Sequence, residues 1–92
     1  MKERKNQSYE VVGLSYSEGV DSAPFVTVKG IGADAEIILK LARRYTIPIV
    51  SDPYLVKALR NIERNHLIPP LLYKAVAIIF ARLQGVLDKG KR

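Results

Sequence analysis

The chain has 92 residues, of which 48% are hydrophobic, and a formal net charge of +6. This size allows one domain with one modest core and excludes a multi-domain protein. Because the chain contains no cysteine, disulfides, thiolate metal sites and thiol nucleophiles are excluded.

The apolar stretches are too short to cross a membrane. The longest uninterrupted one, Ala75 to Ala81, is well below the roughly 20 residues that a bilayer requires. The charged N-terminal MKERKNQS is not followed by an apolar segment, so it does not resemble a secretory signal. We therefore expect a soluble intracellular domain.

The positive charge is concentrated at the two ends of the chain. Residues 1–5 contribute +2 and residues 89–92 contribute +3, so the sequence between them is almost neutral. A folded nucleic-acid-binding module usually carries its basic excess on one face. We therefore interpret the charges as solubilising tails. The alternative is a small basic nucleic-acid-binding protein that acts through its Lys/Arg tails.

The first part of the chain predicts an arm followed by a hairpin. Residues 1–8 are charged and polar, as is typical of a mobile N-terminal arm. Two segments rich in β-forming residues follow, Tyr9–Tyr16 and Phe25–Lys29. The short connection between them contains the turn-rich SEGVDS, which predicts an antiparallel hairpin.

The central segment predicts a β-α-β unit. Apolar residues recur at intervals of three and four and predict a helix with one buried face, which consists of Ala33, Ile37, Ile38, Leu41, Ala42 and Tyr45. Residues 47–51 (IPIVS) are rich in β-branched side chains and too few for a helix. They predict a third strand, which would run parallel to the second after a right-handed crossover.

Two further helices complete the predicted fold. Asp52 and Pro53 suit the start of a helix that ends near His66. A last helix would begin at residues 69–70 (Pro-Pro) and stop at Gly85. The predicted fold class is α/β with the order β-β-α-β-α-α, a small mixed three-stranded sheet packed with three helices. The predicted domain covers residues 9–85, and residues 86–92 form a basic C-terminal tail.

Nothing in the sequence suggests catalysis. The only histidine, His66, is placed at the predicted helix end, where it would meet the last carbonyls rather than act as a ligand or a base. Asp34 and Glu36 are two residues apart and do not face each other on a helix. The residues before that helix, 30–32 (Gly-Ile-Gly), lack the spacing of a phosphate-binding loop and indicate a tight turn. We expect a binding module without enzyme activity, cofactor or metal.

Four motifs follow one another in a specific order and register. They are Ala23-Pro24 with Val28-Lys29-Gly30, Ile47-Pro48-Ile49-Val50, Pro53-x-Leu55-x-x-Ala58-Leu59, and Ile68-Pro69-x-x-Leu72-Tyr73-x-Ala75-Val76-Ala77. Together they resemble the cytoplasmic domain of the FlhB family of type III export switch proteins, from about Asn6 to Leu83. No family motif covers the remaining residues at either end.

The resemblance implies a role in flagellar or virulence protein export. Family members help to select export substrates and switch specificity from rod and hook type to filament type. The family's four membrane helices have no counterpart in this sequence. We therefore expect a free-standing cytoplasmic copy without membrane insertion, recruited peripherally to the export apparatus if at all. The implied partners are export-apparatus proteins or export substrates, and the oligomeric state stays open.

The family's self-cleaving tetrapeptide, Asn-Pro-Thr-His, falls in register on Asn6, Gln7, Ser8 and Tyr9. Only the asparagine is kept. Because Gln7 removes the proline geometry and Tyr9 removes the imidazole, we expect no self-cleavage. The family strand before the tetrapeptide is also missing, so the sheet edge would be exposed, covered by the N-terminal arm, or paired with a partner.

The resemblance finally implies an apolar depression that accepts short hydrophobic export signals. The matching positions are Ala23, Pro24, Ala77 and Phe80. Alanine and proline leave a shallow recess whose exposed apolar surface a short peptide can cover. The alternative for Ala77 and Phe80 is that they belong to the ordinary core of the last helix.

Overall fold

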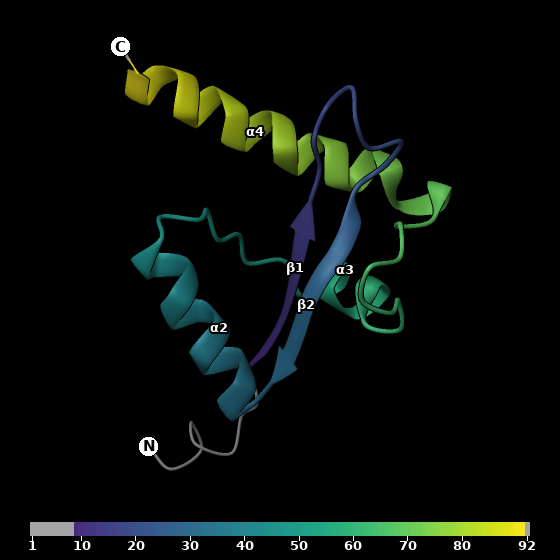
Figure 1. The fold of residues 1–92 in the computed structure, drawn as a ribbon, viewed down its shortest axis with the longest axis vertical. Helices are drawn as coiled ribbons and strands as arrows, with labels where there is room; N and C mark the ends of the chain where they lie inside the picture. The colour runs from purple at the N-terminus through teal and green to yellow at the C-terminus, as the bar shows by residue number, and fades with distance from the viewer. Residues whose placement is uncertain (1–8, 92) are drawn as a thin grey trace.

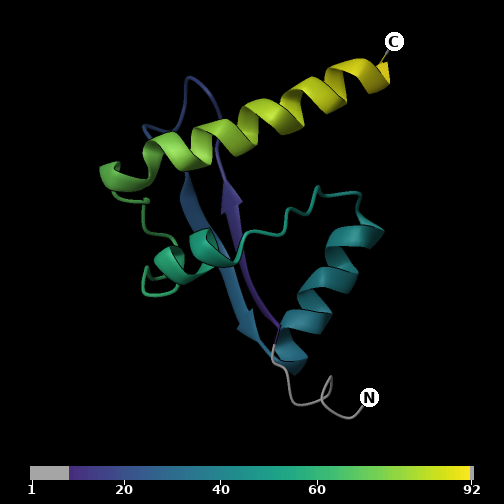
Figure 2. The same ribbon diagram turned by 180° about the vertical axis from the view of Figure 1, so that it is seen from behind.

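The computed structural model describes residues 9–91, and the burial of side chains for residues 9–83. The elements are β1 (Glu10–Ser15), β2 (Phe25–Ile31), α2 (Ala33–Arg44), α3 (Pro53–Leu59), the short 3-10 helix η1 (Pro70–Leu72) and α4 (Tyr73–Lys91). Figures 1 and 2 show the hairpin at the centre, with α2 on the side of β1, α3 against one face, and α4 across one end.

The predicted hairpin is confirmed. β1 and β2 pair antiparallel, with Glu10 opposite Ile31 and Ser15 opposite Phe25. The register shifts between Gly13 and Leu14, which leaves one extra residue in β2 and bends the hairpin. In the connecting loop, the backbone N–H of Ser17 donates to a carboxylate oxygen of Asp21 at 2.7 Å, and this bond closes the turn.

The predicted third strand is wrong. Within residues 9–91 the sheet has two strands, β1 and β2, and residues 47–51 connect α2 to α3 without regular secondary structure. The order is therefore β-β-α-α-α, with neither a parallel pair nor a β-α-β crossover. β-Branched residues favour extended backbone, but a strand also needs an adjacent edge to pair with. In Figures 1 and 2 this segment runs transverse to the hairpin.

Two glycines position the start of α2. Gly32 precedes the helix with a positive φ of 63°, which glycine adopts without strain. Gly30 lets the helix approach β2 closely, because a Cβ there would lie 2.6 Å from Cδ1 of Ile38. The predicted tight turn before the helix is thus confirmed.

The predicted buried face of α2 is largely uncovered. Ala35 is its buried residue, whereas four of the six residues predicted for the apolar face are exposed, among them Ile37 by 56%, Leu41 by 45% and Tyr45 by 66%. Among the described elements, the hairpin is what packs extensively against α2. The spacing of the apolar residues was a correct guide to the helix but not to how much of its surface is covered.

The start of α3 is as predicted and its end is not. A carboxylate oxygen of Asp52 accepts a hydrogen bond from the backbone N–H of Leu55 at 3.0 Å, and Pro53 occupies the first helical position. The helix ends at Leu59, and turns follow it. His66 is therefore not at a helix end, and its Nδ1 lies 3.2 Å from the carbonyl oxygen of Arg64 in this turn region.

Gly85 does not end the last helix. After the 3-10 turn, α4 continues through this glycine to Lys91. A glycine inside a helix costs only about 1 kcal/mol relative to alanine, and strong helix formers on both sides can offset that cost. The apolar start of this helix, after the two prolines, agrees with the prediction.

The core lies between the hairpin, α3 and α4. Leu59, Ile68 and Val76 form its buried centre, and half-buried apolar residues surround it: Val12, Leu14, Leu55, Ile62, Leu72 and Phe80. Residues 65–68 also pair with the start of β2 through backbone hydrogen bonds to Pro24 and Val26. No helix in the described part of the chain is long and apolar enough to span a membrane.

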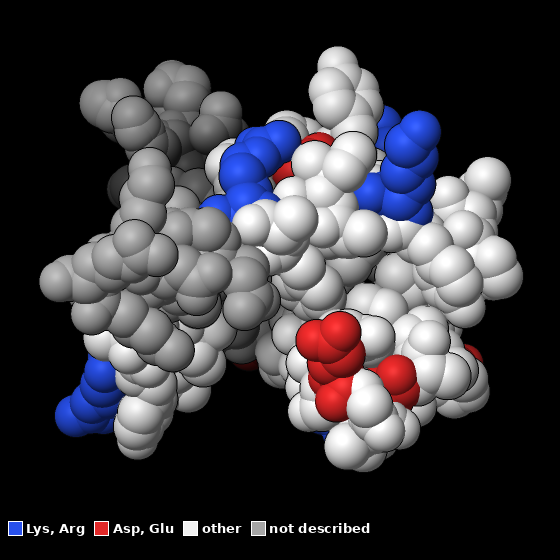
Figure 3. All heavy atoms as spheres, turned by 90° about the horizontal axis from the view of Figure 1, so that it is seen from above, with Lys and Arg blue, Asp and Glu red and all other residues white. Residues whose placement is uncertain are grey.

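The charged side chains do not form one continuous patch on the face shown in Figure 3. Lysine and arginine atoms lie there in separate groups, with neutral surface between them, and acidic atoms gather on another part of the same face.

Candidate functional site

A cavity of about 780 Å³ opens where α4 passes the end of the hairpin. The hairpin and its loop contribute Leu14, Ser15, Tyr16, Glu18, Ser22, Ala23 and Pro24. The segment after α2 contributes Ile47 and Pro48, and α4 contributes Tyr73, Ala77, Phe80 and Leu83. This volume is typical of sites that hold a small molecule or a few side chains.

All four residues that the sequence analysis assigned to an apolar depression line this cavity. Ala23 and Pro24 enter it from the start of β2, and Ala77 and Phe80 from α4. Ala23 is only 3% exposed, so the expectation that it presents open apolar surface is wrong, and it lies deep in the wall instead. Pro24 is half-buried, and its carbonyl oxygen accepts a hydrogen bond from Ile68 at 2.9 Å.

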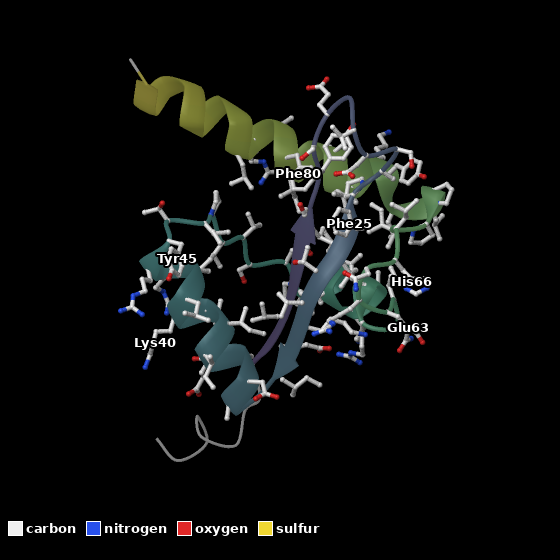
Figure 4. The ribbon with its side chains drawn as sticks, in the orientation of Figure 1. Phe25, Lys40, Tyr45, Glu63, His66 and Phe80 are labelled. Atoms are coloured by element: carbon white, nitrogen blue, oxygen red, sulfur yellow. The ribbon has the colours of Figure 1, made fainter. Side chains whose placement is uncertain are left out.

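Ala77 and Phe80 differ in how far they belong to the core. Phe80 is half-buried and packs against the core cluster, while its ring stacks on that of Tyr16 with centroids 6.3 Å apart. Ala77 is exposed within the cavity. Figure 4 shows Phe80 near the end of the hairpin. Phe80 thus connects the core to the cavity wall, whereas Ala77 is available for contact.

Nine of the thirteen lining residues were not assigned to the site in the sequence analysis, among them Tyr16, Ile47 and Pro48. The last two belong to the segment predicted as a strand, and the chain turns sharply before them because Thr46 adopts a positive φ of 54°. Tyr16 could have been found, since it and Ala23 flank the loop of the predicted hairpin and must lie near each other.

The lining of the cavity is suited to apolar contact rather than to catalysis. Among the lining residues that the structure describes, Glu18 is the only charged one, and the other polar side-chain groups are hydroxyls of serine and tyrosine. His66 and Glu63 lie together on the outer side of the loop after α3, away from Phe80 (Figure 4). Within residues 9–91, no group of three or more histidine or acidic side chains could hold a metal ion.

An ion pair ties β1 to the end of α3, outside the cavity. The guanidinium of Arg60 donates to both carboxylate oxygens of Glu10, with the shortest contact at 2.6 Å. These hydrogen bonds, together with the positive charges of Arg60 and Lys29, hold the pKa of Glu10 below its ordinary value. Lys29 also donates to the carbonyl oxygen of Arg60 at 3.1 Å.

The structure describes only the last residue of the altered tetrapeptide, Tyr9. Asn6, Gln7 and Ser8 lie outside the described residues. Tyr9 is 54% exposed, and its carbonyl oxygen accepts a hydrogen bond from the N–H of Gly32 at 2.8 Å. This bond places the end of the tetrapeptide beside the turn that precedes α2.

Comparison with known proteins relates residues 9–83 to the FlhB HrpN YscU SpaS family. The chain is 40% identical over 77 residues to the flagellar biosynthetic protein FlhB of Aquifex aeolicus (strain VF5), covering 83% of this chain and 22% of that protein. It is 39% identical over 72 residues to YlqH of Bacillus subtilis (strain 168), an uncharacterized protein, covering 78% of this chain and 77% of YlqH.

Solved structures share this fold. The PscU C-terminal domain matches with a TM-score of 0.78 and 29% identity, over 82% of this chain and 96% of that domain. The native SpaS C-terminal domain matches with a TM-score of 0.85 over 91% of this chain and 98% of that domain, and its 19% identity supports the fold alone. The chain spans about a fifth of the length of the FlhB proteins it matches, but most of the length of these C-terminal domains.

Proposed function

Because the chain belongs to the FlhB HrpN YscU SpaS family, we propose that it is a protein-interaction domain of flagellar-type (type III) protein export. It binds export substrates or components of the export gate in the cytoplasm, and it catalyses no reaction of its own. The partner segment is short and apolar, and it binds in the cavity between the hairpin loop and α4.

One observation carries this proposal. Ala23 and Pro24 are more than 50 positions from Ala77 and Phe80 in the sequence, yet all four line the same cavity. Its wall is mainly apolar and comes from three separate parts of the chain. An apolar recess that the fold leaves open can bind an apolar side chain of another protein and remove it from water.

The test is a binding measurement with one substitution inside the cavity and one outside it. Ala77→Asp places a carboxylate on the wall, where an apolar ligand would strip it of water at a cost of about 1–3 kcal/mol. We expect the affinity for purified rod- and hook-type export substrates to fall about tenfold or more.

The matched control is Ala75→Asp. Ala75 is also an exposed alanine of α4, but it does not line the cavity. Both variants should fold, because both side chains are exposed. Equal affinities for the native chain and the two variants would contradict the proposed binding site. Phe80 is unsuitable for this test because it also packs against the core.

We further propose that the chain stays intact between Asn6 and Gln7. Without the proline and the histidine of the family's tetrapeptide, asparagine lacks the geometry and the imidazole associated with cleavage. Mass spectrometry of the purified protein after prolonged incubation should show the full 10.3 kDa chain. The comparison is the variant Gln7→Pro, Ser8→Thr, Tyr9→His, which restores the tetrapeptide. A fragment of the native chain that begins at Gln7 would disprove this prediction.

A further inference from the structure

One carboxylate lies in the wall of the otherwise uncharged cavity. Among the described lining residues, Glu18 is the only charged one, and it is exposed. The ion pair that the structure describes joins Glu10 to Arg60, and the described side-chain hydrogen bonds do not include Glu18. Within the described chain, the carboxylate of Glu18 is therefore free to bind a group of a partner.

The hairpin loop holds Glu18 at this place. The carbonyl oxygen of Ser17 accepts backbone hydrogen bonds from Val20 at 3.0 Å and Asp21 at 2.8 Å, while the N–H of Ser17 donates to the Asp21 carboxylate at 2.7 Å. Gly19 adopts a positive φ of 85°, which glycine reaches without strain. Because the carboxylate of Asp21 is used inside the loop, Glu18 supplies the acidic group that a ligand in the cavity can reach.

The surroundings of Glu18 are negative although the whole chain is positive. Residues 10–28 contain three acidic side chains and no lysine, arginine or histidine. The basic residues that adjoin the other lining segments in the sequence are not among the described lining residues: Arg43, Arg44, Lys74 and Arg82. Figure 3, which looks onto the end of the molecule with the hairpin loop, shows acidic atoms gathered apart from the basic ones.

The excess positive charge of the chain ends does not cancel this local charge. It belongs to residues 1–5, which precede the end of β1 opposite to the loop, and to residues 89–92. Residue 89 follows Leu83, the last described lining residue of α4, by six positions, about 9 Å along the helix axis. Salt screens an exposed charge over about 8 Å at physiological ionic strength. A ligand in the cavity is therefore governed by Glu18 rather than by the net charge.

We propose that Glu18 determines specificity in the cavity: it binds a lysine or arginine that lies directly beside the apolar side chains of the bound segment. When an apolar segment covers the wall, it also removes water from part of the Glu18 carboxylate, which costs free energy unless a cation replaces that water. An acidic residue at this place is repelled. The inference rests on the proposed function and deepens it, because it assigns a charge pattern to the bound segment.

The experiment uses a labelled peptide of defined design and the full chain. The peptide is a short run of leucines with a lysine on each side, so that either direction of binding brings a lysine to Glu18. Its ends are acetylated and amidated to remove their charges. Two further peptides carry glutamine or glutamate in place of lysine.

We expect the lysine peptide to bind about threefold to fivefold more tightly than the glutamine peptide, and the glutamate peptide to bind least tightly. The net charge of +6 alone would favour the glutamate peptide over the other two. The expected order of affinities therefore distinguishes a local contact with Glu18 from attraction by the whole chain.

Variants assign the preference to Glu18. Glu18→Gln should remove the preference for lysine over glutamine, and Glu18→Lys should make the glutamate peptide the tightest of the three. The matched control is Glu63→Gln, the same change at an exposed glutamate on the outer side of the loop after α3, away from Phe80 (Figure 4), and it should leave the order unchanged. Because Glu18 and Glu63 are both exposed, we expect all variants to fold, and circular dichroism checks this.

Every other outcome overturns the inference. No binding of the lysine peptide does so, as does equal affinity for the three peptides or loss of the preference in Glu63→Gln as well. Binding that Ala77→Asp leaves unchanged would place the lysine peptide outside the cavity. The proposed function fails separately: it falls if Ala77→Asp has no effect on the affinity for export substrates, and it stands if that effect is seen while the three peptides bind equally.

Discussion

At the scale of single residues, the contact between Glu10 and Arg60 makes a prediction about pH. The hydrogen bonds from Arg60 lower the pKa of Glu10 in the folded chain. A carboxyl group whose pKa is lower when folded stabilises the fold above its unfolded pKa of about 4.3, and this contribution is lost as the pH falls through the folded value. Stability should therefore decrease with acid below about pH 5.

The substitution Arg60→Gln isolates this contribution. We expect the variant to be less stable than the native chain at pH 7, and the two stabilities to converge as the pH falls through the lowered pKa of Glu10, below which Glu10 is protonated in both. Urea unfolding at a series of pH values measures the difference, and an NMR titration of the Glu10 carboxyl group measures its pKa directly. A constant difference across the whole range would show that Arg60 acts through packing of its side chain instead.

The contacts of single residues can be predicted from the sequence where both partners are close together in the chain. Asp52 caps α3 by accepting a hydrogen bond from the backbone N–H of Leu55, three positions later. A short sequence motif is enough to predict such a cap. The partners Glu10 and Arg60 are 50 residues apart, so no spacing in the sequence connects them. The burial of Ala23 was missed for the same reason, because residues distant in the sequence cover it.

At the scale of elements, the end of α2 contains a strained residue whose replacement should be stabilising. Thr46 has a φ of 54°, a conformation that is unusual for a β-branched residue. The N–H of Thr46 donates to Arg43, and that of Ile47 donates to Ala42, which is the hydrogen-bond pattern of a helix end that normally carries glycine at this position. The turn at Thr46 is followed directly by Ile47 and Pro48, which line the cavity.

Thr46→Gly should raise the free energy of unfolding by about 0.5–1 kcal/mol. Removing the side chain relieves roughly 1–2 kcal/mol of left-handed strain, and the greater freedom of glycine in the unfolded chain offsets part of it. Urea unfolding with a single probe measures the change. Thr46→Val is the matched control: it keeps the branched side chain and loses the hydroxyl that donates to Tyr45, so it should not be stabilising. A destabilised glycine variant would contradict the strain argument.

The predicted elements failed where their formation depends on a neighbour. The hairpin and the helices were predictable, because their hydrogen bonds form within one continuous stretch of chain. Residues 47–51 have the composition of a strand, but within the described chain they pair with neither strand of the hairpin, and the first two of them line the cavity instead. The apolar face of α2 was misjudged similarly, since periodicity shows which side chains share a face but not whether anything covers them.

At the scale of the whole molecule, the cavity could not be deduced from composition or periodicity. It forms only because α4 passes the end of the hairpin and brings Phe80 against Tyr16. The four residues named in advance came from the family resemblance, which carries information about tertiary structure that local patterns lack. The structure added the parts of the wall contributed by the hairpin loop and by the segment after α2.

The net charge leaves a choice between a protein partner and nucleic acid, and ionic strength separates them. Five of the six excess positive charges lie within residues 1–5 and 89–92. If these five neutralised phosphates of duplex DNA, raising the salt from 50 to 200 mM would weaken binding about 500-fold. An apolar segment in the cavity loses little affinity with salt, so we expect export substrates to bind with less than about a tenfold change.

A chain lacking residues 1–5 and 89–92 provides the matched comparison. It keeps every lining residue within the described part of the chain, so we expect its affinity for export substrates to equal that of the full chain. Any binding of a duplex oligonucleotide should disappear with the tails. Two results would identify the tails, rather than the apolar cavity, as the binding surface. One is that the truncated chain no longer binds export substrates, and the other is that the affinity for these substrates falls steeply as the salt concentration rises. Fluorescence anisotropy with both ligands, at both salt concentrations, distinguishes these cases because charge and apolar contact respond to salt so differently.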